Sequence, residues 1–239
     1  MDFISGGSPA ETALKLKPKI TQKFGDPATR QKALSQLGDM DVPEATGVLL
    51  QRFTITVDPH TTDQDEKELA FDLIVSRKND ALEPTREFLK RSDTASSWAL
   101  KVLEAIVPEP EVIGIVVENL TRLGAEYTRD PEKKQVLLNF LASKDDPRIG
   151  PAVLPFVEDM SDDIKIAALN TLAKVKHEPA REPVLTLLTG EETGKRVQSA
   201  CVALLFECGF PVQGFREKVE ARLSDPFHLD KSGVVKKRG

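Results

Sequence analysis

The sequence contains few of the residues on which many protein functions depend. Its 239 residues include two cysteines, three histidines, one tryptophan and one tyrosine. Cys201 and Cys208 are about two turns apart on one expected helix, roughly 10 Å, which is too far for an unstrained disulfide. No HExxH or CxxC motif and no glycine-rich phosphate loop occurs. We therefore expect no catalytic site, no metal and no cofactor, and hence no small-molecule substrate.

Long apolar segments are also missing. No apolar run approaches the ~18 residues that a membrane helix requires. The first seven residues, MDFISGG, contain neither the basic region nor the apolar core of a secretory signal. Because residue 2 is Asp, N-myristoylation is excluded as well. These features predict a cytoplasmic protein without membrane insertion.

The charge balance disfavours nucleic-acid binding. The formal net charge is −5, whereas nucleic-acid binders usually present a basic face to the phosphates. Only the two ends of the chain are locally basic, through Lys15, Lys17, Lys19, Lys23, Lys231, Lys236, Lys237 and Arg238. We expect no salt-dependent gel shift with nucleic acid at physiological salt.

One pattern recurs six times along the chain. Each copy starts at a polar residue or a glycine. Two mostly apolar residues follow seven and eight positions after this start, and a third apolar residue follows eleven positions after it. The copies start near residues 26, 63, 92, 130, 161 and 194, at intervals of 37, 29, 38, 31 and 33 residues. A repeat of this length is typical of stacked small units that bury their apolar faces against one another. Such a stack presents an extended surface and favours a binding role.

Each repeat is expected to be a pair of helices. In the fifth, Ser161 precedes two aspartates, a good N-cap and first turn, and apolar residues follow at helical spacing. Asp26 and Asp130 are each followed by proline, another common helix start. The second helices are predicted near Pro84, Pro151 and Pro183, and over residues 42–52, 111–127 and 213–223.

The segment SDDIKIAALNTLAKVKHEPAREPVLTLL resembles a HEAT repeat, especially the HEAT-like repeats of phycobilisome lyases. The resemblance is strongest over residues 161–190 and extends more loosely over 26–224. It departs from the pattern at Glu66 and Lys133, which stand where the fifth repeat has Ile164. The resemblance implies an all-α solenoid of about six antiparallel helix pairs, a HEAT-like superhelix.

Several segments depart from the regular repeat or flank it. Residues 112–117 are rich in β-branched side chains, which would be compatible with a buried strand. The spacing of the apolar residues that follow favours a helix instead. Residues 53–59 alternate like a strand, and we expect an extended linker there. Residues 9–24 read as an N-terminal capping helix that Pro18 should kink or split. We expect residues 9–225 to form the solenoid, flanked by a flexible N-terminus over 1–8 and a flexible basic tail over 226–239.

Two families of HEAT-type or helical-repeat enzymes can be compared with this sequence, and it lacks the residues that each of them requires. Deoxyhypusine hydroxylases build a di-iron site from several His-Glu pairs, but this sequence has only His177-Glu178. Helical-repeat DNA glycosylases require aromatic and basic groups facing DNA, whereas Trp98 occupies an apolar repeat position here and is expected in the core.

The function predicted from the sequence is that of a non-catalytic adaptor or regulatory scaffold. In HEAT stacks the second helices usually line the concave face, so the resemblance implies that their polar residues bind a partner protein. The candidates are Arg52, Arg86, Lys90, Asn119, Arg122, Arg181 and Arg216. The alternative is an enzyme-like cofactor chaperone or lyase of the phycobilin-lyase type, which a co-purifying tetrapyrrole or metal would favour.

Overall fold

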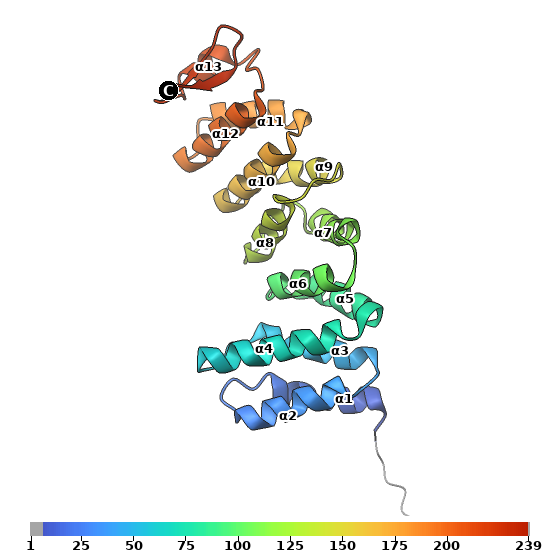
Figure 1. The fold of residues 1–239 in the computed structure, drawn as a ribbon. Helices are drawn as coiled ribbons and strands as arrows, with labels where there is room; N and C mark the ends of the chain where they lie inside the picture. Colours follow the sequence, from blue (N-terminus) through green and yellow to red (C-terminus); the bar gives the residue numbers. More distant parts are fainter. Residues whose placement is uncertain (1–6, 239) are drawn as a thin grey trace, which may run out of the picture. The chain divides into compact units, whose positions relative to one another are not determined.

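The computed structural model describes residues 7–238 as a chain of helices that pack in pairs (Figure 1). The predicted flexible N-terminus therefore lies largely outside the described residues, and Gly239 lies outside them too. No helix in the described part is long and apolar enough to cross a membrane. The predicted all-α class is confirmed, with one small β-hairpin near the C-terminus as the exception.

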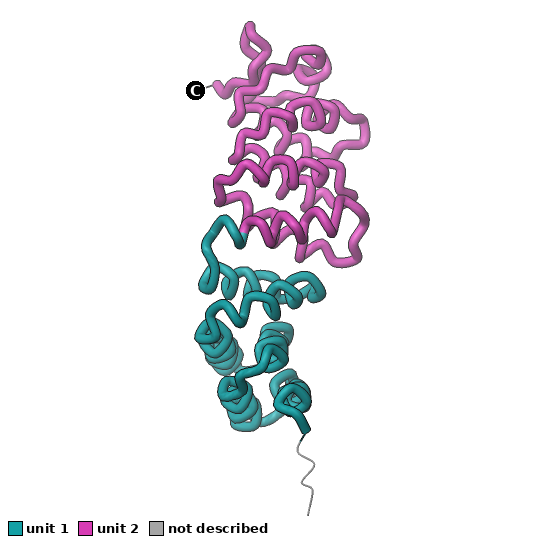
Figure 2. The backbone as a smooth tube through the Cα atoms, turned by 90° about the vertical axis from the view of Figure 1, so that its right-hand side faces the viewer, with its two compact units in different colours: residues 1–112 teal, residues 113–239 magenta. Residues whose placement is uncertain are grey.

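The chain divides into two compact units, residues 1–112 and 113–239 (Figure 2). Unit 1 contains α1 (Pro9–Ile20), α2 (Pro27–Gly38), α3 (Pro43–Leu50), the 3-10 turn η1 (Gln51–Thr54), α4 (His60–Val75), η2 (Lys78–Ala81), α5 (Leu82–Arg91) and α6 (Ser96–Ile106). Within this unit α1 packs on α2 and α3, α3 packs on α5, and α5 packs on α6.

Unit 2 begins within α7 (Glu109–Leu123). It continues with α8 (Glu132–Leu141), α9 (Ile149–Val153), η3 (Leu154–Glu158), α10 (Asp162–Val175), η4 (Glu178–Ala180), α11 (Arg181–Thr189), α12 (Lys195–Cys208), α13 (Arg216–Glu220), β1 (Phe227–Leu229) and β2 (Val235–Lys237). The first helices α8, α10 and α12 pack in succession, and α11 contacts both η3 and α12.

The repeat positions recognised in the sequence form the cores of both units. Nearly all the small and leucine-type positions are buried: Ala33, Leu34, Leu37, Ala70, Ile74, Ala99, Leu100, Leu103, Leu137, Leu138, Leu141, Ala168, Leu169, Leu172, Cys201, Val202 and Leu205. A residue three or four positions on lies on the same side of a helix, so this spacing gives each first helix one continuous apolar stripe. The predicted register is therefore confirmed.

The helix starts agree closely with the sequence in four repeats. In the second repeat α4 begins at His60, three residues before Asp63, and the third repeat differs as well. Ser8 and Glu11 form a capping box at α1, and the Asp26 carboxylate accepts hydrogen bonds from two backbone N–H groups of α2. Ser92 was expected to start the third repeat, but its hydroxyl donates to the carbonyl of Thr94 instead. The helix begins at Ser96, after Ala95 in the left-handed region at φ 60°. That conformation, rather than a side-chain cap, sets the start of α6.

The structure shows the conformation of the three segments that departed from the repeat pattern. Residues 112–117 belong to α7, as the spacing favoured. Pro18 lies in the last turn of α1, where the helix continues for two more residues without a break. The expected linker at 53–59 has its first two residues in η1, and Ile55 and Val57 are buried beyond it. This segment is part of the core of unit 1 rather than a surface connection.

The segment 226–239, for which a flexible tail was predicted, contains two short strands. Residues 227–229 and 235–237 pair as an antiparallel hairpin, and β2 packs against α12. Gly233, at φ 80°, supplies the left-handed turn, and Val235 is 1% exposed. Phe227 meets Phe206 of α12 edge to face at 5.7 Å between ring centroids. The hairpin is stabilised because its apolar side chains pack against α12.

Candidate functional site

The predicted row of binding residues is not a row of exposed side chains. Arg52 and Asn119 are 0% and 5% exposed, so neither presents its side chain to a partner. Asn119 donates to the carbonyl of Ile115, one turn back in α7, and Arg52 belongs to the buried network described below. These two residues are not part of an exposed surface, because polar side chains of this region also serve the packing inside a repeat.

Two more of the predicted arginines bind the backbone of the C-terminal region. Arg181 donates to the carbonyls of Pro211 and Gln213, at 2.7 and 3.0 Å. Arg216 donates to the carbonyl of Asp230 at 2.9 Å. Both guanidinium groups thus hold chain segments in place near the hairpin.

The remaining candidates lie on the surfaces of two different helices. In α5, Arg86 pairs with Glu83 at 3.2 Å, and Lys90 lies 3.9 Å from a carboxylate oxygen of Glu87. Arg122 is exposed in the last turn of α7. Ion pairs within one exposed helix contribute little to stability, and these residues stay predicted contacts.

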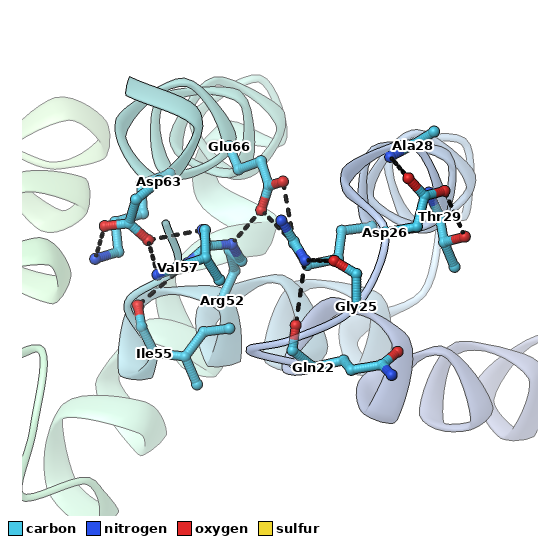
Figure 3. Close-up of polar contacts among 12 residues, drawn as sticks. Gln22, Gly25, Asp26, Ala28, Thr29, Arg52, Ile55, Val57, Asp63 and Glu66 are labelled. Carbon is cyan, nitrogen blue, oxygen red and sulfur yellow. Dashed lines mark hydrogen bonds and ion pairs between the residues drawn. The ribbon is translucent and has the colours of Figure 1, made fainter. Parts of the chain in front are cut away.

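Unit 1 contains a buried network of five charged residues (Figure 3). Arg30 donates from Nε to both carboxylate oxygens of Glu66, at 3.0 and 2.9 Å. Arg52 donates from Nε to Glu66 at 2.9 Å and from Nη2 to Asp63 at 2.8 Å. Lys67 completes the network with a 2.7 Å bond from Nζ to Asp63. The side chains of Arg30, Arg52 and Glu66 are 2% exposed or less.

The network also binds backbone in the connections around it. Arg30 donates to the carbonyls of Gln22 and Gly25, which lie in the loop between α1 and α2. Arg52 donates to the carbonyl of Ile55, and the N–H of Val57 donates to Asp63. Figure 3 shows these contacts converging from the loop and the extended segment on the helices that they join. The charges therefore fix the connections of the first two repeats as well as neutralising one another.

Asp63 is held ionised by its neighbours. Burial raises the pKa of this carboxyl, but hydrogen bonds from Lys67, Arg52 and the Val57 N–H outweigh that effect. The net result is a pKa below the ordinary value of 3.8. A depressed carboxyl pKa contributes stability above the unfolded-state value, and this contribution is lost as pH falls through the folded-state value.

We expect the substitution Asp63→Asn to lower the melting temperature of unit 1 at neutral pH. The difference from the unsubstituted chain should shrink as the pH falls below about 4, because protonation then removes the same charge from Asp63. Thermal unfolding followed between pH 7 and pH 2 measures it. A difference that stays constant down to the lowest pH would contradict the assignment.

The network had a signal in the sequence. Glu66 occupies the repeat position that Ile164 fills in the fifth repeat, and a charge at a core position requires a buried partner. In the sequence pattern Glu66 stands out as a departure from the repeat. The partners could not be read from the sequence, because Arg30 is 36 positions away from Glu66.

A second buried ion pair lies in unit 2. Nζ of Lys134 in α8 donates to Asp159 at 2.8 Å, and both side chains are at most 4% exposed. The other oxygen of Asp159 accepts the N–H of Ser161 at 2.9 Å. This pair fixes the turn between η3 and α10, on which Glu158 and Met160 are exposed, Met160 at 74%.

A groove runs beside that turn in unit 2, with a volume of about 650 Å³. We call it the α11 groove. It is lined by Val157, Glu158, Lys165, Pro179, Glu182, Pro183, Thr186, Leu187, Gly190 and Thr193. A neighbouring depression lined by residues 190–194, Asp162 and Lys165 shares three of these residues and continues it. The groove thus lies between two successive second-helix segments, η3 and α11.

The charges along the α11 groove are mostly negative. Five carboxylates line it and its continuation: Glu158, Asp162, Glu182, Glu191 and Glu192. Lys165 is the lysine among the lining residues, and its Nζ lies 3.4 Å from Asp162. Arg222 approaches from outside the lining set and donates to the carbonyl of Gly190 at 3.1 Å.

The remaining titratable groups of interest are dispersed. Within residues 7–238 no three His, Cys, Asp or Glu side chains are grouped so that they could hold a metal ion. His177 packs against Gly150, and burial lowers its pKa. Burial raises the pKa of the Cys201 thiol to about 12. Trp98 is partly buried and stacks on Phe53 at 4.8 Å between ring centroids, so the predicted core position is only partly enclosed.

Comparison with known proteins yields little. No family model and no curated protein matches the sequence. A solved structure of human deoxyhypusine hydroxylase in complex with glycerol is similar to the chain, with 15% sequence identity, coverage of 91% of each chain and a TM-score of 0.38.

Proposed function

We propose that this chain is a non-catalytic adaptor that binds a partner protein in the α11 groove, and that its repeats are of the HEAT-like type. The adaptor acts in the cytoplasm. The observation that supports the proposal best is the groove itself. It combines apolar side chains with exposed charged ones. One border is held by a buried ion pair and the other by partly buried hydrogen bonds.

The borders of the groove are preorganised. On one side the buried pair of Lys134 and Asp159 fixes the turn after η3. On the other side the hydroxyl of Thr193 donates to the carbonyl of Leu187 at 2.6 Å, and Gln198 donates to the carbonyl of Thr193 at 2.6 Å. A surface that is already ordered loses less conformational entropy when a partner binds.

The groove can be tested by site-specific cross-linking in the native cell. A benzophenone-bearing amino acid at Thr186, which is exposed on α11 and lines the groove, should cross-link a specific protein. The matched control is Asn170, exposed on the first helix α10 and outside the groove lining. The same group at Asn170 should not capture that protein.

A binding measurement with the captured protein completes the test. In purified form it should bind the chain, and Thr186→Trp, which fills the groove, should weaken binding at least tenfold while Asn170→Trp should not. Capture of the same proteins from both positions, or binding that is unaffected by Thr186→Trp, would refute the proposal.

A further inference from the structure

The lining of the α11 groove selects a particular kind of side chain. Pro179, Pro183 and Leu187 supply apolar surface, and the carboxylates of Glu158, Glu182 and Glu191 lie in the same groove and its continuation. Lysine and arginine have this combination of properties, because their aliphatic stems pack on apolar surface while the charged heads reach outward. An acidic or purely apolar segment would satisfy only part of the lining.

Most of the negative charge of the groove has no cationic partner among residues 7–238. Lys165 is the lysine in the lining, and it already lies beside Asp162. Arg196, on the next first helix, pairs with Asp163 at 2.8 Å, and Arg222 is bound to a backbone carbonyl. Among residues 7–238, Glu158, Glu182, Glu191 and Glu192 form no ion pair. Like charges gathered in a concave site favour a cationic occupant.

The exposed side chains on either side of the buried Asp159 are held in fixed positions. Asp159 is anchored by Lys134 and by the Ser161 N–H, so its neighbours Glu158 and Met160 project from a rigid turn. A methionine that is 74% exposed beside a carboxylate offers an adaptable apolar contact next to a charge. This combination extends the mixed lining of the groove beyond its edge.

We infer that the occupant of the α11 groove is a basic segment of a partner protein, rich in lysine or arginine. The inference rests on the proposed adaptor function and specifies the chemistry of its partner. The stems of the basic residues pack between Pro183 and Leu187, and their heads pair with the carboxylates on the two borders.

Labelled peptides of about 12 residues, ~40 Å when extended, provide a direct test. One carries alternating lysine and leucine, a second has glutamate in place of lysine, and a third has glutamine. Fluorescence anisotropy with the intact chain should show binding of the lysine peptide alone. Because exposed ion pairs are screened, the Kd should rise when the salt concentration is raised from about 0.05 M to 0.15 M.

Neutralising the groove should weaken this binding. The triple substitution Glu158→Gln, Glu191→Gln and Glu192→Gln changes exposed side chains only and should raise the Kd about tenfold, as expected for three exposed ion pairs. A matched control neutralises three exposed carboxylates elsewhere, through Asp39→Asn, Asp65→Asn and Asp145→Asn. The control has the same net charge and should leave the Kd within twofold of the unsubstituted chain.

Several results would overturn the inference. One is equal binding of the three peptides, and another is equal weakening of binding by both triple variants. A third is self-association of the chain that the groove substitutions abolish, because the occupant would then be a second copy of this chain. If the protein cross-linked at Thr186 still binds the glutamine triple variant normally, the basic-segment inference fails while the adaptor function stands. If no protein is cross-linked there, the adaptor function fails whatever the peptides do.

Discussion

Replacing Glu66 by alanine should lower the free energy of unfolding of unit 1 by about 3–5 kcal/mol. The substitution leaves Arg30 and Arg52 fully buried without the carboxylate that both contact. Removing one partner of a buried ion pair costs much more than the pair contributes, because the remaining charge stays away from water. Here one carboxylate serves two guanidinium groups, so the effect should lie at the upper end of this range.

Trp98 provides the measurement. It is the only tryptophan, belongs to unit 1 and stacks on Phe53, which follows Arg52 directly in the sequence. Urea unfolding followed by its fluorescence should show a lower midpoint for Glu66→Ala. If the protein is too unstable to purify, Glu66→Gln, which keeps the shape and an acceptor oxygen, should give a smaller loss in the same direction.

The control lies two positions away on the same helix. Glu68 pairs with Lys101 at 3.0 Å, but its side chain is 40% exposed. Glu68→Ala should change the free energy of unfolding by less than about 1 kcal/mol. Equal losses of unfolding free energy for Glu66→Ala and Glu68→Ala would contradict the claim that the network stabilises unit 1 strongly because it is buried.

Replacing Lys134 by alanine should destabilise unit 2 by a similar amount, about 3–5 kcal/mol. Asp159 would remain 3% exposed with its main cationic partner gone, and the carbonyl of Glu126 would lose a hydrogen-bond donor. Hydrogen exchange should show reduced protection in α8 and α10, which pack on each other. Binding of the lysine peptide should weaken too, because the turn that carries Glu158 is no longer fixed.

The matched control for this prediction is Lys174. This lysine is on α10 and lies 3.5 Å from Glu207, with 62% of its side chain exposed. Lys174→Ala should leave both hydrogen exchange and peptide binding close to those of the unsubstituted chain. A Lys134→Ala variant with normal exchange in α10 would show that the buried pair does not hold the turn.

The sequence predicted the repeat well because its signal is local. Apolar residues spaced three and four apart define one helix face, and this geometry depends only on the helix itself. The six first helices accordingly lie at the predicted places, although α6 starts four residues after Ser92. The second helices were located less precisely, since α9 and α13 have only five residues each and continue as turns or loops.

The binding residues were harder to predict because exposure is not a property of residue type. Arginine is usually at the surface, yet Arg52 is buried and Arg181 and Arg216 hold backbone carbonyls. In each case the partner lies on another element. The α11 groove was hard to predict for the same reason, since it forms only through tertiary packing. Glu158 and Glu191 are 33 positions apart in the sequence, and the contact between η3 and α11 makes them part of one surface.

The amino-acid order alone determined the helices, their apolar stripes and the number of repeats, because those follow from the 3.6-residue period of a single helix. Tertiary packing decided which charges are enclosed, which are exposed and that the last residues fold into a hairpin. The physical reason is that a charge can be buried only where opposite charges and backbone acceptors converge on it from several elements. That convergence exists only once the helices have packed.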